Sequence, residues 1–209
     1  VTLTNTDVTK YGSDKLLTWM TDGQSDFWAN STQKNWKDDV NGARRFTNDS
    51  DVQFVGAGES ITVLDEVWTG NVTITGTGYE FTGAGSIYGR HSSVAGEVHK
   101  MTVADGASVT FSNTGSVYFE GGVELGAGAT LRLEYLSTAA TTNWQAPVTG
   151  DEGTLVVATS GIRTNVLTSV MGSSVGTVAL DNYTTIEIGA DGAGEAAKLA
   201  AAKNVDIRE

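Results

Sequence analysis

Two stretches of the chain match each other at a separation of 22 residues, and this repeat constrains the fold more than any other feature. Within it, Gly106, Val109 and Phe111 recur as Gly128, Leu131 and Leu133. The tripeptide Gly-Ala-Gly also occurs at 56–58, 83–85, 126–128 and 192–194, at intervals near multiples of the same length. A fixed period of this size is typical of a solenoid, a propeller or another repeat array.

Short runs of alternating apolar and polar residues follow one another from about residue 46 to residue 190. In the longest run, Ala129, Leu131, Leu133 and Tyr135 alternate with polar residues. Alternation over four to seven residues, broken by Gly, Asn or Asp, is the signal of a half-buried strand. The 29 threonines and 26 glycines agree with many short strands joined by tight turns. We expect no helix before residue 190.

These features together favour an all-β fold, a right-handed parallel β-helix (solenoid). A coil of about 20–25 residues holds three short strands, and stacking the coils about 4.8 Å apart pairs each strand with its equivalents. Alternate side chains then form an apolar column inside the stack. A propeller blade requires longer repeats with an aromatic signature. A β-sandwich or jelly roll is the remaining alternative, because alternation does not fix strand direction.

The two ends of the chain differ from the coils in composition. Residues 16–45 carry Trp19, Trp28 and Trp36 together with many charged residues. The open end of a β-stack would pair with another chain unless it were covered. We therefore expect a Trp-rich N-terminal cap region at 1–45, β-helix coils at 46–190, and an Ala-rich C-terminal tail or linker, with some helix, at 191–209.

Charge and composition exclude several classes of protein. Thirteen Lys and Arg against 25 Asp and Glu give a net charge of −12, which disfavours nucleic-acid binding. No apolar run approaches the roughly 20 residues of a membrane-spanning helix. The absence of Cys excludes disulfides and cysteine zinc sites. The chain begins at Val1 without a signal-peptide pattern, as expected of a processed or excised fragment.

Patterns typical of catalysis or cofactor binding occur, but each lacks its context. Residues 172–176 read Gly-Ser-Ser-Val-Gly, as in a nucleophile elbow, yet a strand-like run follows and both histidines come earlier in the chain. His91 and His99 lack metal-ligand spacing. The G-x-G-x-x-A pattern at 192–197 lies too near the last residue to open a βαβ unit. Oxygen-rich turns at 22–26 and 48–51 resemble calcium loops only in composition. We expect no catalytic residues, no metal and no cofactor.

Polysaccharide cleavage is the main enzymatic alternative. A parallel sheet could bring Glu120, Glu124 and Glu134 to one face. Glycosidases need two carboxylates in matched geometry, and a lyase would also use a basic residue. Between residues 101 and 190 the only bases are Arg132 and Arg163.

Sugar or partner binding needs less exact geometry. Indole rings stack on sugars, and the candidate binding residues are Trp28, Trp36 and Trp144. For Trp28 and Trp36, burial in the cap is the competing interpretation. Trp144 lies in a loop-like segment at 141–147, so we expect it to be the most exposed tryptophan.

A distinctive order of residues runs through Trp19, Ser25-Asp-Phe-Trp28, Asn35-Trp36 and the segments 49–54 and 71–85. This order resembles the autotransporter-associated β-strand repeat of Gram-negative bacteria, over residues 16–190 and most clearly over 19–85. It implies a β-helical passenger domain, exported across the outer membrane by a separate barrel and held at the cell surface. A Cys-free chain suits passage through a narrow pore.

The family resemblance implies location and scaffold, but no single activity. We expect a non-catalytic extracellular passenger segment that acts as a surface scaffold or adhesin through multivalent contacts. Its expected partners are a host or bacterial surface glycan or protein, and further copies of itself. A carbohydrate-binding or polysaccharide-cleaving β-helix module is the alternative.

Overall fold

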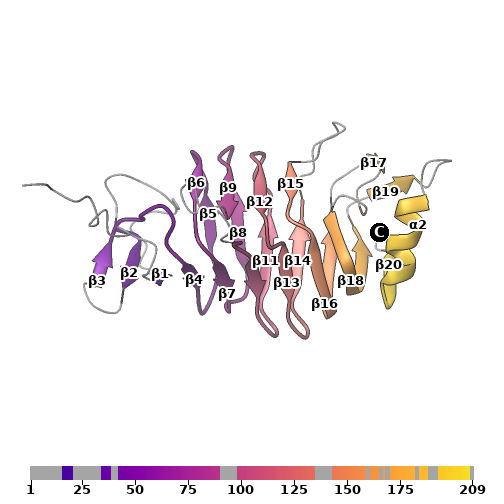
Figure 1. The fold of residues 1–209 in the computed structure, drawn as a ribbon, viewed down its shortest axis with the longest axis horizontal. Coiled ribbons are helices and arrows are strands. Elements are labelled where there is room, and N and C mark those ends of the chain that lie inside the picture. Colours follow the sequence, from indigo (N-terminus) through magenta and orange to yellow (C-terminus); the bar gives the residue numbers. More distant parts are fainter. Residues whose placement is uncertain are drawn as a thin grey trace, which may run out of the picture.

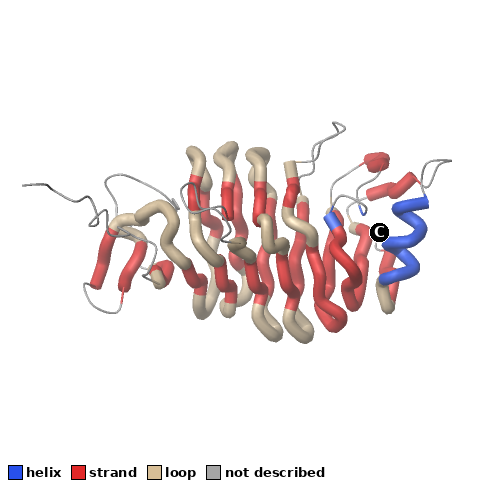
Figure 2. Tube along the Cα trace, viewed as in Figure 1, coloured by secondary structure: helices blue, strands red, loops and turns tan. Residues whose placement is uncertain are grey.

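The protein is an elongated stack of β-strand coils in a computed structural model (Figure 1). The structure describes residues 16–20, 34–38, 42–89, 98–134, 143–158, 161–164, 167, 170–181, 184–187 and 193–207. The strands lie across the long axis of the stack (Figure 2). In the described part, no helix has the length and hydropathy that crossing a bilayer requires.

Three rows of parallel strands run along the stack. The first row contains β4 (Val52–Phe54), β7 (Val72–Ile74), β10 (Met101–Val103) and β13 (Val123–Leu125). The second row contains β5 (Ser60–Thr62), β8 (Tyr79–Thr82), β11 (Ser108–Phe111) and β14 (Thr130–Leu133). The third row contains β6 (Val67–Trp68), β9 (Ile87–Gly89), β12 (Val117–Phe119) and β15 (Trp144–Gln145).

Two long strands continue the stack beyond these coils. β16 (Val148–Val157) and β18 (Met171–Leu180) each span the first and second rows, and they join both rows into one sheet. β17 (Gly161–Thr164) and β19 (Thr184–Glu187) form a separate parallel pair. The expected parallel β-solenoid is thus confirmed, while its handedness stays a prediction.

The 22-residue repeat corresponds to true strand pairing. Val109 is the register partner of Leu131, and Phe111 is that of Leu133. However, the near-even spacing of the Gly-Ala-Gly tripeptides does not mark equivalent positions in successive coils. The copies at 56–58 and 126–128 occupy the corner between the first and second rows, whereas the copy at 83–85 follows β8 at the next corner. Coil length is not constant, because Val72 pairs with Val52 on one side and with Met101 on the other.

An aromatic column fills the interior of the coils. Its rings contact one another from coil to coil, with centroids 4.9–5.4 Å apart, through Trp36, Phe54, Phe81, Phe111 and Trp144. Each of these side chains is buried, and aliphatic inward positions surround them. Edge-to-face and tilted pairs of this kind add stabilisation beyond the area that they bury. Strand pairing and ring packing therefore both run along the long axis.

The N-terminal region begins the stack with strands of mixed direction. β1 (Leu17–Trp19) pairs in parallel with β4, and β2 (Trp36–Asp38) and β3 (Gly42–Arg44) add antiparallel strands. The Trp19 ring lies 5.1 Å from that of Trp36, and its Nε1 donates to Glu59 Oε1 at 2.5 Å. Trp28 lies outside the described residues. A complete Trp-rich cap over 1–45 stays a prediction.

The C-terminal segment packs on the last coils. Helix α2 (Ala193–Ala201) places Leu199 against the core, with Ala202 just after it, and Lys198 Nζ donates to the carbonyls of Met171 and Gly172. β20 (Asn204–Ile207) then pairs with β18 and continues the second row. The described part of 191–209 is therefore attached to the solenoid by packing and strand pairing.

The hydroxyl group of Tyr79 makes the stability of the core depend on pH. Its hydroxyl donates to the carbonyl of Val55 at 2.7 Å. Burial raises the pKa of Tyr79 above its usual value of 10.0, and the charge of Glu59 adds to this. As the pH rises through 10.0, Tyr79 ionises first in the unfolded chain, so its stabilising contribution is lost above that pH.

We expect Tyr79→Phe to cost about 1 kcal/mol of unfolding free energy at neutral pH, through loss of one hydrogen bond. The difference from the wild type should shrink above pH 10, because the variant lacks the ionisable hydroxyl. Urea unfolding from neutral pH to pH 11 measures both effects. A difference that grows with pH would contradict the assignment.

Candidate functional site

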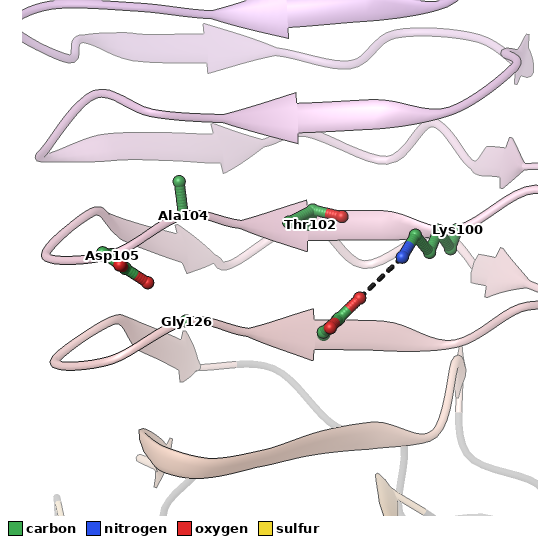
Figure 3. Close-up of a pocket in the computed structure, with 6 residues that line it drawn as sticks. Lys100, Thr102, Ala104, Asp105 and Gly126 are labelled. Carbon is green, nitrogen blue, oxygen red and sulfur yellow. Dashed lines mark hydrogen bonds and ion pairs between the residues drawn. The ribbon is translucent and has the colours of Figure 1, made fainter.

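A shallow groove lies on the outer surface of the first row (Figure 3). It has a volume of about 480 Å³ and runs across β10 and β13 and the turns that follow them. Its walls are formed by Lys100, Thr102, Ala104, Asp105, Glu124 and Gly126. The small residues Ala104 and Gly126 leave the floor low. The groove is open to solvent along its length, as suits an extended polar ligand better than an enclosed small molecule.

The charged groups of the groove serve the stack itself. Lys100 Nζ lies 2.6 Å from Glu124 Oε2, and these side chains are 50% and 58% exposed. Asp105 Oδ1 accepts a hydrogen bond from the backbone N–H of Ala127 at 2.9 Å, which connects two successive coils. A Cβ at Gly126 would collide with that carboxylate. Asp105 and Glu124 therefore both contribute contacts between successive coils.

Asp51 repeats this arrangement near the start of the stack. Its Oδ1 accepts from the backbone N–H of Asn71 at 2.6 Å and from the Asn71 side chain at 3.2 Å. The oxygen-rich turn at 48–51 is therefore used, through Asp51, to connect coils. In the described ranges, no group of three or more His, Asp or Glu side chains could hold a metal ion. The turn at 22–26 lies outside these ranges.

The three carboxylates of the enzymatic alternative are not brought together. Glu124 faces outward from the first row, Glu134 follows β14 in the second row, and Glu120 follows β12 in the third row. The expectation of a shared face is wrong, because successive runs of the sequence occupy different sides of each coil. Between any two of these residues the chain turns at least one corner of the coil.

Arg132 is also engaged in the stack. Its Nη1 donates to Asp181 Oδ2 at 2.5 Å and its Nε to Glu134 Oε1 at 2.8 Å. Partial burial acts to lower the pKa of Arg132, but the hydrogen bonds and charges of Asp181 and Glu134 outweigh it and raise that pKa. Arg132 is therefore a fixed cation that joins coils. Arg163, the other base of this region, lies on β17.

The nucleophile pattern at 172–176 lies wholly inside β18. A nucleophile elbow requires a sharp turn from a strand into a helix, whereas residues 172–176 are followed by further strand residues up to Leu180. Ser174 Oγ donates to Asp151 Oδ1 at 2.5 Å across neighbouring coils. His99 is buried just before β10, and His91 lies outside the described residues.

Two of the candidate binding tryptophans are buried. Trp144 is 2% exposed, lies 5.2 Å from Phe111 and donates from Nε1 to the carbonyl of Ala146 at 2.6 Å. The expectation that it is the most exposed tryptophan is wrong, because it occupies an inward position of β15 opposite Val117. Trp36 is buried beside Phe54, in agreement with the competing interpretation. Neither ring can stack on a sugar from these positions.

The structure instead places aromatic side chains on the outer surface of the third row. Trp68 pairs in register with Tyr88, and Tyr88 with Tyr118. Their chain neighbours Val67, Ile87 and Val117 point inward and are buried, while the three aromatic side chains are partly exposed. The Trp68 and Tyr88 rings are stacked, with centroids 4.7 Å apart. We call Trp68, Tyr88 and Tyr118 the aromatic row.

Polar side chains border the aromatic row. Ser86 and Ser116 precede the same strands, and Ser86 Oγ accepts from the backbone N–H of Ser116 at 2.9 Å. Asn143 continues this line, with its Nδ2 donating to the carbonyl of Gly115 at 3.1 Å. Gln145 follows Tyr118 in register and is exposed. The third row thus presents aromatic rings beside hydroxyl and amide groups.

The sequence carried a signal for the aromatic row. Trp68, Tyr88 and Tyr118 each follow a β-branched apolar residue, at separations of 20 and 30 residues. These separations equal the local coil lengths, which the sequence alone did not supply.

Comparison of the chain with family models, with curated proteins and with solved structures gives no match.

Proposed function

We propose that this chain is a non-catalytic extracellular scaffold that binds a surface glycan or protein through repeated contacts along its length. The observation that carries the proposal is the aromatic row of Trp68, Tyr88 and Tyr118, held in register on one side of an elongated stack. Trp and Tyr are the residues most enriched at energetically important positions of interfaces. A regular row on a rigid scaffold suits multivalent contact.

The setting is proposed to be that of an autotransporter passenger at the bacterial surface. The parallel β-solenoid, the absence of Cys and the net charge of −12 support this setting. The full-length gene provides the test, and we expect it to encode an N-terminal export signal and a C-terminal barrel. A gene without an outer-membrane barrel would contradict the proposal of location.

The binding proposal is tested with a triple variant, Trp68→Ala, Tyr88→Ala and Tyr118→Ala. We expect beads coated with this variant to lose adhesion to epithelial cells by about tenfold or more, because loss of one hot-spot aromatic costs about 2 kcal/mol and each 1.4 kcal/mol is about tenfold in affinity. The matched control replaces Thr62, Thr82 and Thr110, which face outward from the second row, with alanine. Equal adhesion of both variants and the wild type would refute the role of the aromatic row.

Carbohydrate binding is the second candidate, favoured by the open groove that the charged side chains of Lys100 and Glu124 line. An array of neutral and acidic oligosaccharides tests it, with Lys100→Ala as the variant expected to lose any acidic ligand. Periodate treatment of the cells separates a glycan partner from a protein partner, since it destroys vicinal diols of sugars. Release of cleaved sugar by the wild type would overturn the non-catalytic assignment.

A further inference from the structure

Carboxylates border the aromatic row at its first and last rings. Glu66 and Trp68 lie on either side of the buried Val67, at the start of β6. Glu120 follows Tyr118 in the same way, with one buried residue between them. Because successive side chains of an extended chain alternate between two faces, each glutamate lies on the outer face beside an aromatic side chain. Both glutamates are exposed, so the aromatic row shares its surface with negative charge.

These two carboxylates differ from other carboxylates of the stack. Glu80 accepts a hydrogen bond from Ser112 Oγ at 2.9 Å, and Glu124 lies 2.6 Å from a lysine ammonium group. In the described part of the chain, by contrast, neither a hydrogen bond nor an ion pair engages Glu66 or Glu120. An exposed charge that serves no contact between coils is available to a ligand.

The rings of the aromatic row have faces that no other ring covers. Trp68 and Tyr88 are stacked with centroids 4.7 Å apart, so each covers one face of the other. Tyr118 is in register with Tyr88, yet among the described residues it makes no ring contact. The face of an aromatic ring is electron-rich and attracts a cation within about 6 Å of its centroid. Uncovered ring faces and free carboxylates therefore favour the same kind of group.

We propose that the partner of the aromatic row is a basic protein segment, rich in Arg and Lys. The inference rests on the proposed function, because it takes the aromatic row as a binding surface and names the chemistry of what binds there. A guanidinium group stacks on an aromatic face and also donates two parallel hydrogen bonds to a carboxylate. An extended segment with a basic residue at every second position presents such groups on one face, toward the rings and the glutamates together.

Charge disfavours the other occupants of this surface. The chain carries a net charge of −12, so Glu66 and Glu120 would repel a second copy of it, and they would repel an acidic polysaccharide in the same way. A neutral sugar stacks on aromatic faces but gains nothing from the charge of two carboxylates. Arg90, two positions after Tyr88, lies outside the described residues.

Fluorescence anisotropy tests the proposal with a short labelled peptide in which Arg and Gly alternate. The double variant Glu66→Gln and Glu120→Gln should raise the dissociation constant of this peptide by about fivefold or more, because it removes two exposed charge pairs. The matched control, Asp151→Asn with Glu152→Gln, removes the same charge from exposed positions of β16. It should change the dissociation constant by less than about twofold, since distant surface charges are screened by salt. The same peptide with Glu in place of Arg should not bind.

Equal binding of the Arg peptide by the wild type and the Glu66→Gln, Glu120→Gln variant would overturn the proposal. Equal weakening by the control variant would overturn it too, because binding would then follow the net charge alone. Titration with neutral oligosaccharides provides the opposite outcome, since their binding to the wild type but not to the aromatic triple variant would replace the basic partner by a sugar. Circular dichroism verifies that each variant is folded.

Cell adhesion separates this inference from the proposed function. An excess of the Arg peptide should block the adhesion of coated beads, and the glutamine double variant should lose adhesion as the aromatic triple variant does. Loss by the aromatic variant with full adhesion of the glutamine variant would overturn the basic partner and leave the binding role of the aromatic row intact. Full adhesion of both variants would contradict the proposed function, and the peptide titration would still decide whether the aromatic row binds cations.

Discussion

Phe81→Ala is expected to lower the free energy of unfolding by about 3–5 kcal/mol, the range measured for deletion of a buried aromatic ring. The Phe81 side chain is fully buried, and its ring lies 5.1 Å from that of Phe54 and 4.9 Å from that of Phe111. Removing it interrupts the aromatic column in the middle of the stack. The strands above and below are held at their pairing distance, so the cavity cannot close easily.

Urea unfolding followed by tryptophan fluorescence and by circular dichroism measures the effect. Thr110→Ala, on the neighbouring strand but facing outward, is the control and should change stability by no more than about 0.5 kcal/mol. Solenoid coils contact mainly their neighbours, so loss of Phe81 should also separate the transitions seen by the two probes. A Phe81→Ala cost no greater than that of Thr110→Ala would show that the rings do not support one another.

The main architecture could be predicted because, in a parallel stack of coils, residues that repeat in the sequence are also the residues that pair in neighbouring strands. The match of Val109 with Leu131 is both a repeat in the sequence and a pair in the sheet. Alternation then sorts the residues of each strand into inward and outward sets. Net charge, the absence of Cys and the order of residues in a motif can also be read without coordinates, because each depends only on residue type or on position in the chain.

What the sequence alone did not supply is the length of each coil, because turns tolerate insertion at little energetic cost. Without those lengths, Trp68, Tyr88 and Tyr118 do not align, and the aromatic row is invisible. Trp144 illustrates a second difficulty. Its neighbours are Thr-rich and include the one proline, which indicates a loop. However, Trp144, Ala146 and Val148 are all buried, so alternation was present there too.

Glycines at the corners permit the close approach of successive coils, so replacing one of them is expected to lower stability strongly. Gly115→Ala is expected to cost about 3 kcal/mol, at the upper end of the usual range for overpacking. A Cβ at this position would lie well under 3.0 Å from the carbonyl oxygen and carbon of Gly85 in the preceding coil. The obstacle is backbone, so no side-chain rotation relieves it, and the coils must separate locally.

Gly106→Ala is the matched control for Gly115→Ala. Gly106 has a φ of +69°, but a Cβ there would meet nothing within 4 Å. The expected cost is therefore only the left-handed strain of an alanine, about 1–2 kcal/mol. Thermal unfolding ranks the two variants, and hydrogen exchange of the third-row amides locates the separation of coils next to Gly115. Equal costs would mean that conformational freedom alone, and not the distance between coils, selects glycine in these turns.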